Sequence, residues 1–311
     1  MRFVAVDWGT SRIRALLVDG ERVVARSESN EGVSRLRAGE HAAVFAHHCG
    51  AWLAAEPDLP VILVGMAGSR EGLALARYVP CPAGPDEIAD AAVSVEVGNG
   101  QLATIVPGLT SLRGDAADVM RGEETHLLGS GVTDGLVCLP GTHCKWALME
   151  RGRVASFATF LTGELYGLLR EHSMVGRPAT EPADPAGFEA GLAASSLRGE
   201  GAAQGGLLNA LFVARANTLT GRLGPDRLGL YLSGLLTGEE IAGAFRLFGR
   251  SETVTVIADP PRADLYLGAL TSLGIGVRLR GQEETLLAGL AAILPRIVRK
   301  ASAERGVADP T

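Results

Sequence analysis

The chain has 311 residues, of which 47% are apolar, 21% charged and 5% aromatic, so it is long enough for two domains with a substantial core. Its formal net charge of −6 argues against wide contact with nucleic acid. Glycine is frequent, at 41 residues, but it is neither periodic nor joined to Pro/Ser tracts. Collagen-like and low-complexity structures are therefore excluded.

Several common functional motifs are missing from the sequence. Lys145 and Lys300 are the only lysines, and neither stands in a Gly-Lys-Ser/Thr sequence, so the chain has no P-loop. The four cysteines lack CxxC spacing and the six histidines include no HExxH, which argues against a zinc site. The first apolar run ends at Asp7, too early for a signal peptide, and no later stretch has the length of a membrane span. We expect a cytoplasmic protein with reduced thiols and no membrane partner.

The first half of the sequence predicts an antiparallel meander followed by a mixed helix and strand region. Apolar runs bounded by turns at Gly9 and Gly20 predict three strands. A later buried strand runs into a glycine-rich segment beginning at Gly65, a pattern that suggests close approach of a ligand. The strands are expected over 3–6, 13–18, 22–27 and 61–64, and helices over 42–55 and 115–128.

The second half repeats the opening pattern of the first. Gly9-Thr10 and Gly141-Thr142 are 132 residues apart, as are the next hairpin glycines, Gly20 and Gly152. This common offset predicts two related domains, over 1–130 and 131–311. In the second domain we expect strands over 137–139, 145–149, 154–157 and 254–258, and helices over 207–222, 238–248 and 282–299.

The turn after the first strand has the composition of a site for phosphate and metal. Gly9 allows the backbone to approach a phosphate, to which backbone N–H groups, Thr10, Ser11 and Arg12 would donate. Asp7, at the end of the strand, could hold Mg²⁺ through water. The alternative is an ordinary hairpin with polar turn residues.

The corresponding turn of the second half offers a second set of phosphate ligands. Gly141 and Thr142 would face the first turn across a cleft that fits a nucleotide triphosphate. Lys145 would add a point charge to the phosphates, or else be a solvated surface lysine. His143 and Cys144 lack an orienting partner in the sequence, so we interpret them as hydrogen-bonding or packing residues and not as nucleophiles. His143 is counted with Gly141, Thr142 and Lys145 among the predicted phosphate-binding residues.

Three blocks of the sequence stand out: DVMRGEET at 118–125, PGTHCKW at 140–146, and FLTGEL at 160–165 with HS at 172–173. These blocks resemble the 2-dehydro-3-deoxygalactonokinase family, within the sugar kinase/Hsp70/actin superfamily. The resemblance implies an α/β protein of two ribonuclease H-like domains, the actin/sugar kinase-like ATPase fold, with an interdomain cleft. It also implies ATP-dependent phosphorylation of the terminal 6-hydroxyl of the small-molecule sugar acid 2-dehydro-3-deoxy-D-galactonate, with Mg²⁺.

A kinase of this kind needs a carboxylate to accept the proton of the attacking hydroxyl. In the related glycerol kinase-like enzymes the base opens a helix as Gly-Asp, with a glycine seven residues on. Gly114-Asp115 followed by Gly122 reproduces that spacing, so Asp115 is the predicted base, a role compatible with an N-cap. Asp118 is the second candidate, and Arg121, Glu123 and Glu124 are interpreted as a structural brace.

A sugar-acid pocket needs a cation for the carboxylate and polar groups for the hydroxyls. Arg70 and Arg113 are the candidate carboxylate ligands. For adenosine, the turn at 258–262 lacks the glycine pair expected of the superfamily, so Ser233 and Gly234 are the alternative contact. The remaining candidate substrate residues are Asn30, Gly32, Gly68, Ser69, Thr162 and Glu164.

Two alternative functions remain open from the sequence. The acceptor could be another sugar or sugar acid, such as 2-dehydro-3-deoxygluconate, because one fold serves many acceptors. An ATP-dependent switch protein of the same fold is a further alternative, although the 311 residues show no additional DNA-binding or peptide-binding module. The sequence carries no signature of an oligomeric state.

Overall fold

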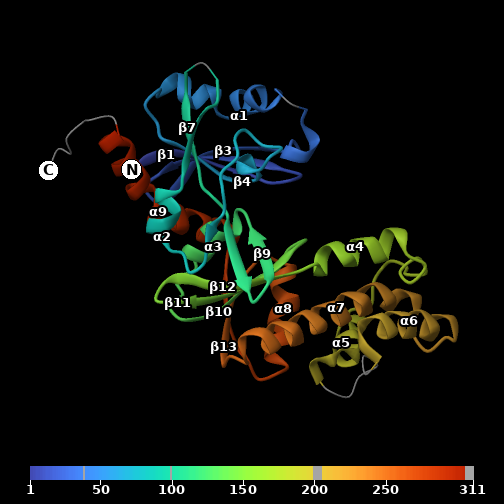
Figure 1. The fold of residues 1–311 in the computed structure, drawn as a ribbon. Helices are drawn as coiled ribbons and strands as arrows, with labels where there is room; N and C mark the ends of the chain where they lie inside the picture. Colours follow the sequence, from blue (N-terminus) through green and yellow to red (C-terminus); the bar gives the residue numbers. More distant parts are fainter. Residues whose placement is uncertain (38, 99, 199–204, 305–311) are drawn as a thin grey trace. The chain divides into compact units, whose positions relative to one another are not determined.

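The computed structural model describes residues 1–37, 39–98, 100–198 and 205–304 (Figure 1). Its contacts divide the chain into two units. Unit 1 comprises Met1–Asp134, Met149–Phe157 and the segment from Gln282, and unit 2 comprises Gly135–Leu148 and Ala158–Gly281. The predicted boundary near residue 130 is close to Asp134, where the chain first passes from unit 1 to unit 2. The final helix, from Gln282, and the tip of the second meander, Met149–Phe157, nevertheless belong to unit 1.

The sheet of unit 1 has six strands in the order β3-β2-β1-β4-β7-β6. The first three strands are antiparallel, whereas β4 is parallel to β1 and β7 parallel to β4. α1 (His41–Ala55) covers one face and places Phe45 and Cys49 in the core with Val4 and Val6 (Figure 1). The strands are β1 (Arg2–Trp8), β2 (Ile13–Asp19), β3 (Arg22–Ser29), β4 (Val61–Gly65), β6 (Val93–Glu96) and β7 (Leu102–Ile105).

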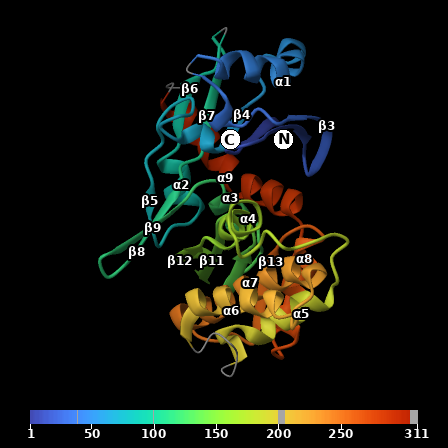
Figure 2. The same ribbon diagram turned by 90° about the vertical axis from the view of Figure 1, so that its right-hand side faces the viewer.

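The rest of unit 1 carries a small sheet and three helices beside the main sheet. α9 (Gln282–Glu304) packs against α2 (Pro85–Asp90) and α3 (Glu123–Leu128) (Figures 1 and 2). At the α3–α9 crossing, a Cβ on Gly289 would lie 1.8 Å from the carbonyl oxygen of Thr125, so the two backbones touch. The small sheet has the order β5-β8-β9, from β5 (Val79–Pro80), β8 (Leu109–Arg113) and β9 (Ala116–Met120).

The sheet of unit 2 repeats the strand order of the first five strands of unit 1. Its order is β12-β11-β10-β13-β14, with β13 parallel to β10 and β14 parallel to β13. Connections of a few residues join the first three strands, as in an antiparallel meander. The strands are β10 (Gly135–Leu139), β11 (Cys144–Glu150), β12 (Arg153–Phe160), β13 (Thr253–Ile257) and β14 (Gly276–Arg280).

Helices cover this second sheet, and the other helices of the unit pack against the long α7 (Pro225–Phe248). α5 (Ala186–Ala194) crosses α7 at glycines: a Cβ on Gly191 would lie 1.9 Å from the carbonyl oxygen of Tyr231. Trp146 of β11 and Tyr266 of α8 lie in the core beneath. The remaining helices are α4 (Thr162–His172), α6 (Gly206–Leu219) and α8 (Arg262–Thr271).

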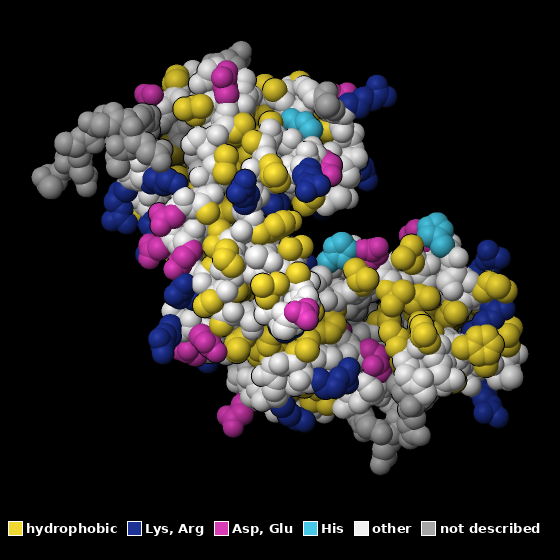
Figure 3. Space-filling model, viewed as in Figure 1, with side chains coloured by type: hydrophobic (Ala, Val, Ile, Leu, Met, Phe, Trp, Pro, Cys, Tyr) yellow, Lys and Arg dark blue, Asp and Glu magenta, His cyan; other side chains and the backbone are white. Residues whose placement is uncertain are grey.

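Apolar side chains also gather on the outer surface of this helical layer (Figure 3). α6 buries Leu211 and Ala214 but exposes Leu208, Phe212 and Leu219. This helix is therefore apolar on two sides, one of which packs on α7. In the part of the chain that the structure describes, no helix is both long and apolar enough to span a membrane.

Two expected elements are wrong. Residues 115–128 form β9 and the short helix α3, because positive φ angles at Gly114 (60°) and Gly122 (105°) interrupt the chain at both ends of the strand. The helix expected over 238–248 is the second half of α7, which begins at Pro225. The other expected strands and helices are confirmed, with end shifts of a few residues.

Candidate active site

The first Gly-Thr turn, between β1 and β2, is closed by the loop that follows β3. Gly9 N–H donates to the Arg12 carbonyl at 2.9 Å, and Ser34 N–H donates to the Thr10 carbonyl at 3.0 Å. Arg12 Nε donates to Asn30 Oδ1 at 3.4 Å. The structure therefore brings together the predicted phosphate residues Gly9, Thr10, Ser11 and Arg12 and the predicted substrate residues Asn30 and Gly32.

Gly32 is fixed by close packing against this turn. A Cβ there would lie 2.3 Å from both Arg12 N and Ser11 C, and neither backbone atom can move without moving the turn. We expect Gly32→Ala to lower the free energy of unfolding by about 1–3 kcal/mol or more, and to raise the KM for ATP. Urea unfolding and steady-state kinetics measure the two effects.

Gly50→Ala is the matched control for Gly32→Ala. Gly50 lies within α1, and a Cβ there meets nothing within 4 Å. Alanine in a helix interior is about 0.5–1 kcal/mol more favourable than glycine, so this variant should be as stable as the wild type or more so. A Gly32→Ala protein with wild-type stability and kinetics would show that the turn is not held in the way described.

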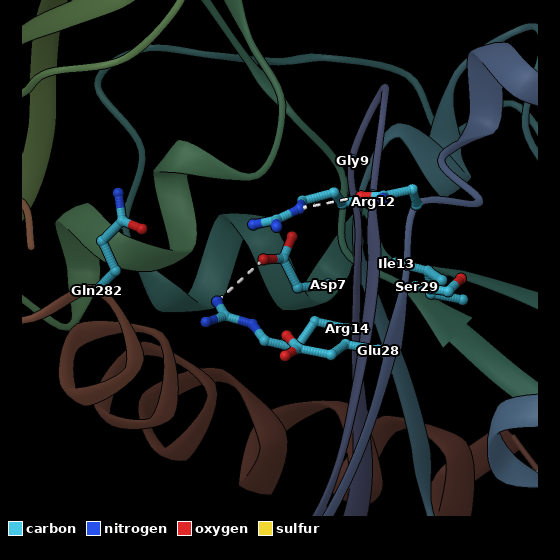
Figure 4. Close-up of a pocket in the computed structure, with 9 residues that line it drawn as sticks. Asp7, Gly9, Arg12, Ile13, Arg14, Glu28, Ser29 and Gln282 are labelled. Atoms are coloured by element: carbon cyan, nitrogen blue, oxygen red, sulfur yellow. Dashed lines mark hydrogen bonds and ion pairs between the residues drawn. The ribbon is translucent and has the colours of Figure 1, made fainter.

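A polar pocket of about 420 Å³ lies beside the turn (Figure 4). Asp7 Oδ2 is 3.1 Å from Arg14 Nη2, and both side chains remain partly exposed, at 30% and 25%. Glu28, opposite Arg14 on β3, and Gln282, the first residue of α9, also line the pocket, together with Ser29 and Asn30. The pocket thus holds two carboxylates and the guanidinium groups of Arg12 and Arg14.

Three segments converge at the carboxyl end of β1. Gly65 ends the parallel strand β4 with φ of 80°, and a Cβ there would lie 2.8 Å from the Trp8 carbonyl and 3.6 Å from Asp7 Oδ1. Gly122, immediately before α3, lies close to Gly65, because a Cβ on Gly122 would lie 3.2 Å from the Gly65 Cα. Glu123, which opens α3, therefore lies next to the pocket end of β1.

Asp115 is placed differently from the sequence prediction. It does not open a helix but lies exposed, with Gly114, at the turn between β8 and β9 (Figure 2). β9 separates it from Gly122, which amounts to about 20 Å for an extended strand. The Gly-acid pair that does open a helix is Gly122-Glu123. The reason for the error is that Ala116 and Ala117 favour a helix locally, whereas strand pairing with β8 decides their conformation.

Asp118 and Arg113 interact with each other on the same hairpin. Arg113 Nη2 is 3.8 Å from Asp118 Oδ2, and another guanidinium nitrogen of Arg113 donates to the Phe157 carbonyl. Asp118 Oδ1 also accepts a hydrogen bond from Val119 N–H at 2.8 Å. Both side chains are therefore engaged in contacts of the hairpin. This weakens the case for Asp118 as the catalytic base and for Arg113 as a ligand of the substrate carboxylate.

α3 carries acidic and basic groups toward the same region. Glu123 accepts a hydrogen bond from Arg121 N–H at 3.0 Å, and Glu124 accepts one from Gly122 N–H at 2.7 Å. Glu124 is fully buried, and burial raises its pKa to about 8. Burial lowers the pKa of His126, an effect that Asp7 opposes. Glu123 was predicted only as part of a brace, and the glycine before it was the signal that could have singled it out.

The segment after β4 contains the other predicted substrate residues of unit 1. Gly68 and Ser69 are buried, whereas Arg70 is exposed. A Cβ on Gly68 would lie 2.7 Å from Arg121 Nη1, so the guanidinium of Arg121 packs directly on that glycine. Arg121 also donates to the Ala76 carbonyl at 2.8 Å, which makes it an internal support of this segment, as predicted.

The second Gly-Thr turn, Pro140–His143, lies in unit 2 and contacts the start of α4. Glu164 N–H donates to the Thr142 carbonyl at 3.0 Å, and the Glu164 carboxylate pairs with the His143 ring. A Cβ on Gly163 would lie 2.3 Å from the Gly141 carbonyl. The predicted substrate residues Thr162 and Glu164 thus adjoin the predicted phosphate residues Gly141, Thr142 and His143.

Lys145 is not a surface lysine. It is 4% exposed, and its Nζ is 3.3 Å from the His143 carbonyl, so the ammonium group lies under the turn. A buried ammonium group must be hydrogen-bonded or paired, and the His143 carbonyl is one such partner of Lys145.

Ser233 and Gly234, the alternative adenosine contact, are helical residues. They lie within α7, where a Cβ on Gly234 would meet the Phe188 carbonyl at 2.0 Å. Gly234 therefore serves the packing of α5 on α7, and a role of Ser233 and Gly234 toward adenosine stays a prediction. The loop between β13 and α8 does follow the end of a buried parallel strand, as expected.

The described residues include no group of three or more His, Cys, Asp or Glu side chains able to hold a metal ion by themselves. Mg²⁺ bound with a nucleotide needs only one or two carboxylates, because phosphates and water supply the other ligands. Asp7 fits this requirement, since one of its oxygens remains outside the ion pair with Arg14 and it lines a polar pocket.

Two sheets of the same strand order, each opened by a meander with a Gly-Thr turn, define the actin/sugar kinase-like ATPase fold. The activator of 2-hydroxyisocaproyl-CoA dehydratase from Clostridium difficile, solved with bound ADPNP, shares this fold at 12% identity, with a TM-score of 0.52 and full coverage of both chains.

The family is shown by closer relatives. The 2-keto-3-deoxy-galactonokinase family model matches residues 7–293. The 2-dehydro-3-deoxygalactonokinase of Escherichia coli K12 is 34% identical over 299 residues, 94% of this chain and 97% of that protein. A crystal structure of a Sinorhizobium meliloti protein assigned to the same kinase is 34% identical, with a TM-score of 0.82 over 95% of this chain and 96% of that one. The chain belongs to the 2-keto-3-deoxy-galactonokinase family.

Proposed function

We propose that the protein transfers the γ-phosphoryl group of ATP to the 6-hydroxyl of 2-dehydro-3-deoxy-D-galactonate. The observation that carries this proposal is the family match over residues 7–293, together with relatives that the chain covers almost completely. The reaction needs a small-molecule substrate and sites for the phosphates of ATP, and the two Gly-Thr turns are the candidates for those phosphate sites. A cytoplasmic location, where ATP is available, is part of the proposal.

The phosphates are proposed to bind at the two Gly-Thr turns. Backbone N–H groups, Thr10, Ser11 and Arg12 would serve the first turn, and Thr142 and His143 the second, with Lys145 beneath it. Mg²⁺ would be held near Asp7 and would supply charge neutralisation at the phosphates. The interdomain cleft implied by the resemblance stays a prediction.

The acceptor hydroxyl needs a carboxylate that takes its proton. We propose Glu123 in place of Asp115. It satisfies one part of the criterion that selected Asp115, a Gly-acid pair at the start of a helix, although Ser130 and not a glycine stands seven residues on. It also lies beside the glycines that contact the end of β1. The proton of the 6-hydroxyl would pass to Glu123 as the oxygen attacks the γ-phosphorus, and ADP would leave.

The sugar acid is proposed to bind between Asn30 and the segment Gly68–Arg70. Arg70 is exposed at the end of that segment, and no ion pair joins it to another residue that the structure describes. It is therefore the better candidate for the substrate carboxylate than Arg113, whose guanidinium is engaged by Phe157 and Asp118.

The test is ADP release with ATP, Mg²⁺ and a panel of acceptors: the 2-keto-3-deoxy derivatives of galactonate, gluconate and a pentonate, beside glycerol and neutral hexoses. We expect the galactonate derivative to give the highest kcat/KM. Preference for the gluconate derivative would change the substrate and keep the kinase. Activity only on a neutral sugar, or ATP hydrolysis that no acceptor stimulates, would contradict the proposal.

A further inference from the structure

A buried carboxylate in unit 2 hydrogen-bonds to three elements near the second Gly-Thr turn, namely β11, α8 and α4. Glu240 lies on α7 and is 2% exposed. Its Oε1 accepts a hydrogen bond from Trp146 Nε1 of β11 at 2.8 Å, and the Tyr266 hydroxyl of α8 lies 2.9 Å from both carboxylate oxygens. Thr162, the first residue of α4, hydrogen-bonds to the same carboxylate.

The network reaches the turn itself through Cys144. The Cys144 thiol lies 3.5 Å from the Tyr266 hydroxyl, and it also hydrogen-bonds to Glu240. The same sulfur accepts from Gly141 N–H at 3.3 Å and lies 3.2 Å from the Gly141 carbonyl. Gly141 is thus held from below by a thiol that is itself held by Tyr266 and Glu240.

The network reaches α4 by a second route. Thr162 opens α4, and the next residue, Gly163, packs directly on the Gly141 carbonyl. Glu164 then bonds to Thr142 through its backbone N–H. Because Thr162 bonds to Glu240, the carboxylate fixes both sides of the turn: the strand that leaves it and the helix that packs on it.

A carboxylate is an expensive group for this position. Leu236 and Ala244, one helical turn before and after Glu240 on α7, are apolar and buried, and burial raises the pKa of Glu240. Only its hydrogen bonds offset this cost. For packing alone, an apolar side chain would serve as well, so what the carboxylate adds is the fixed geometry of its partners.

We propose that Glu240 is a positioning residue for nucleotide binding, which holds the turn Pro140–His143 in the conformation that receives the phosphates. This inference rests on the proposed function of that turn. Glu240 acts through Trp146, Cys144 and Thr162, and it touches neither ATP nor the sugar acid.

The test compares Glu240→Gln, Glu240→Leu and Tyr266→Phe with the control Glu239→Gln. Glu239 is the next residue on α7, but its carboxylate accepts hydrogen bonds from Ser196 N–H at 2.6 Å and Ser196 Oγ at 2.8 Å, away from the turn. The readouts are ADP affinity by calorimetry, the KM for ATP, the KM for the sugar acid, and the Tm.

We expect Glu240→Leu to raise the KM for ATP and the Kd for ADP at least tenfold, while the KM for the sugar acid changes less than twofold. Glu240→Gln should restore most of the affinity, because its amide oxygen can still accept from Trp146. Tyr266→Phe, which keeps the ring and removes the link to Cys144, should fall between the two. If Glu240→Leu does not fold, the Gln and Phe variants decide the question.

Two results would overturn the inference. One is wild-type ADP affinity in Tyr266→Phe and in Glu240→Leu, or in Tyr266→Phe and Glu240→Gln if the Leu variant does not fold. The other is an equal loss of affinity in Glu239→Gln, which would indicate general destabilisation. Thr142→Asp tests the proposed phosphate-binding role of the turn independently of Glu240, because a carboxylate in the turn should repel phosphates. If Thr142→Asp binds ADP normally, the assignment of the turn fails and the inference fails with it.

Discussion

Replacing Glu123 with Gln is expected to lower kcat for phosphorylation of the sugar acid about a thousandfold, within the usual range for loss of a general base. The KM for ATP should change only a few-fold, because the amide oxygen of Gln can still accept the hydrogen bond from Arg121 N–H. Rates of ADP release under saturating ATP and sugar acid measure the effect.

Asp115→Asn is the paired control for this prediction. Asp115 is exposed at the β8–β9 turn, so its substitution should leave kcat within a few-fold of wild type and the Tm unchanged. The opposite pattern, with turnover lost in Asp115→Asn and kept in Glu123→Gln, would restore the base that the sequence alone indicated.

Glu124→Gln is expected to stabilise the protein increasingly as the pH rises. The carboxyl group is buried, which raises its pKa from 4.5 to about 8, so the folded state binds a proton that the unfolded chain releases. Wild-type stability from this group is fully present below about pH 4.5 and is lost as the pH rises toward 8. At ~1.4 kcal/mol per pKa unit, the difference between the proteins reaches up to ~5 kcal/mol at pH 8.

Urea unfolding of both proteins at several pH values between 5 and 8.5 measures this difference. The neutral amide keeps an oxygen for the hydrogen bond from Gly122 N–H, so the variant should lack the pH-dependent term but keep the contact. Glu21→Gln, at an exposed hairpin turn of the same unit, is the control and should follow the wild type. Parallel stability curves for wild type and Glu124→Gln would contradict the prediction.

The parts of the fold that sequence reasoning predicted correctly are those set by local pattern. Short apolar runs between Gly-containing turns identified both meanders, and the repeated offset of Gly9 and Gly141 identified the duplication. The first candidate site followed from the same turn residues, since Asp7, Gly9 and Arg12 do line one pocket.

The errors arose where tertiary contacts override local preference. Residues 116–120 became a strand because β8 pairs with them. The part that Gly234 plays in the packing of α5 on α7 was likewise not visible from the sequence. The buried carboxylates, Glu124 and Glu240, were equally hidden, because a sequence does not show which acidic side chain faces a core. The pairing of Thr162 and Glu164 with the second turn depended on the fold in the same way.

The assignment of α9 to unit 1 bears on the order in which the protein is made. α9 comes from the last described part of the chain, and it buries Leu286, Leu290 and Ile293. During synthesis, the first 134 residues therefore leave the ribosome without the helix that packs on α2 and α3. Unit 1 can reach its final packing only after unit 2 has been translated, so the two units cannot mature strictly one after the other from the N-terminus.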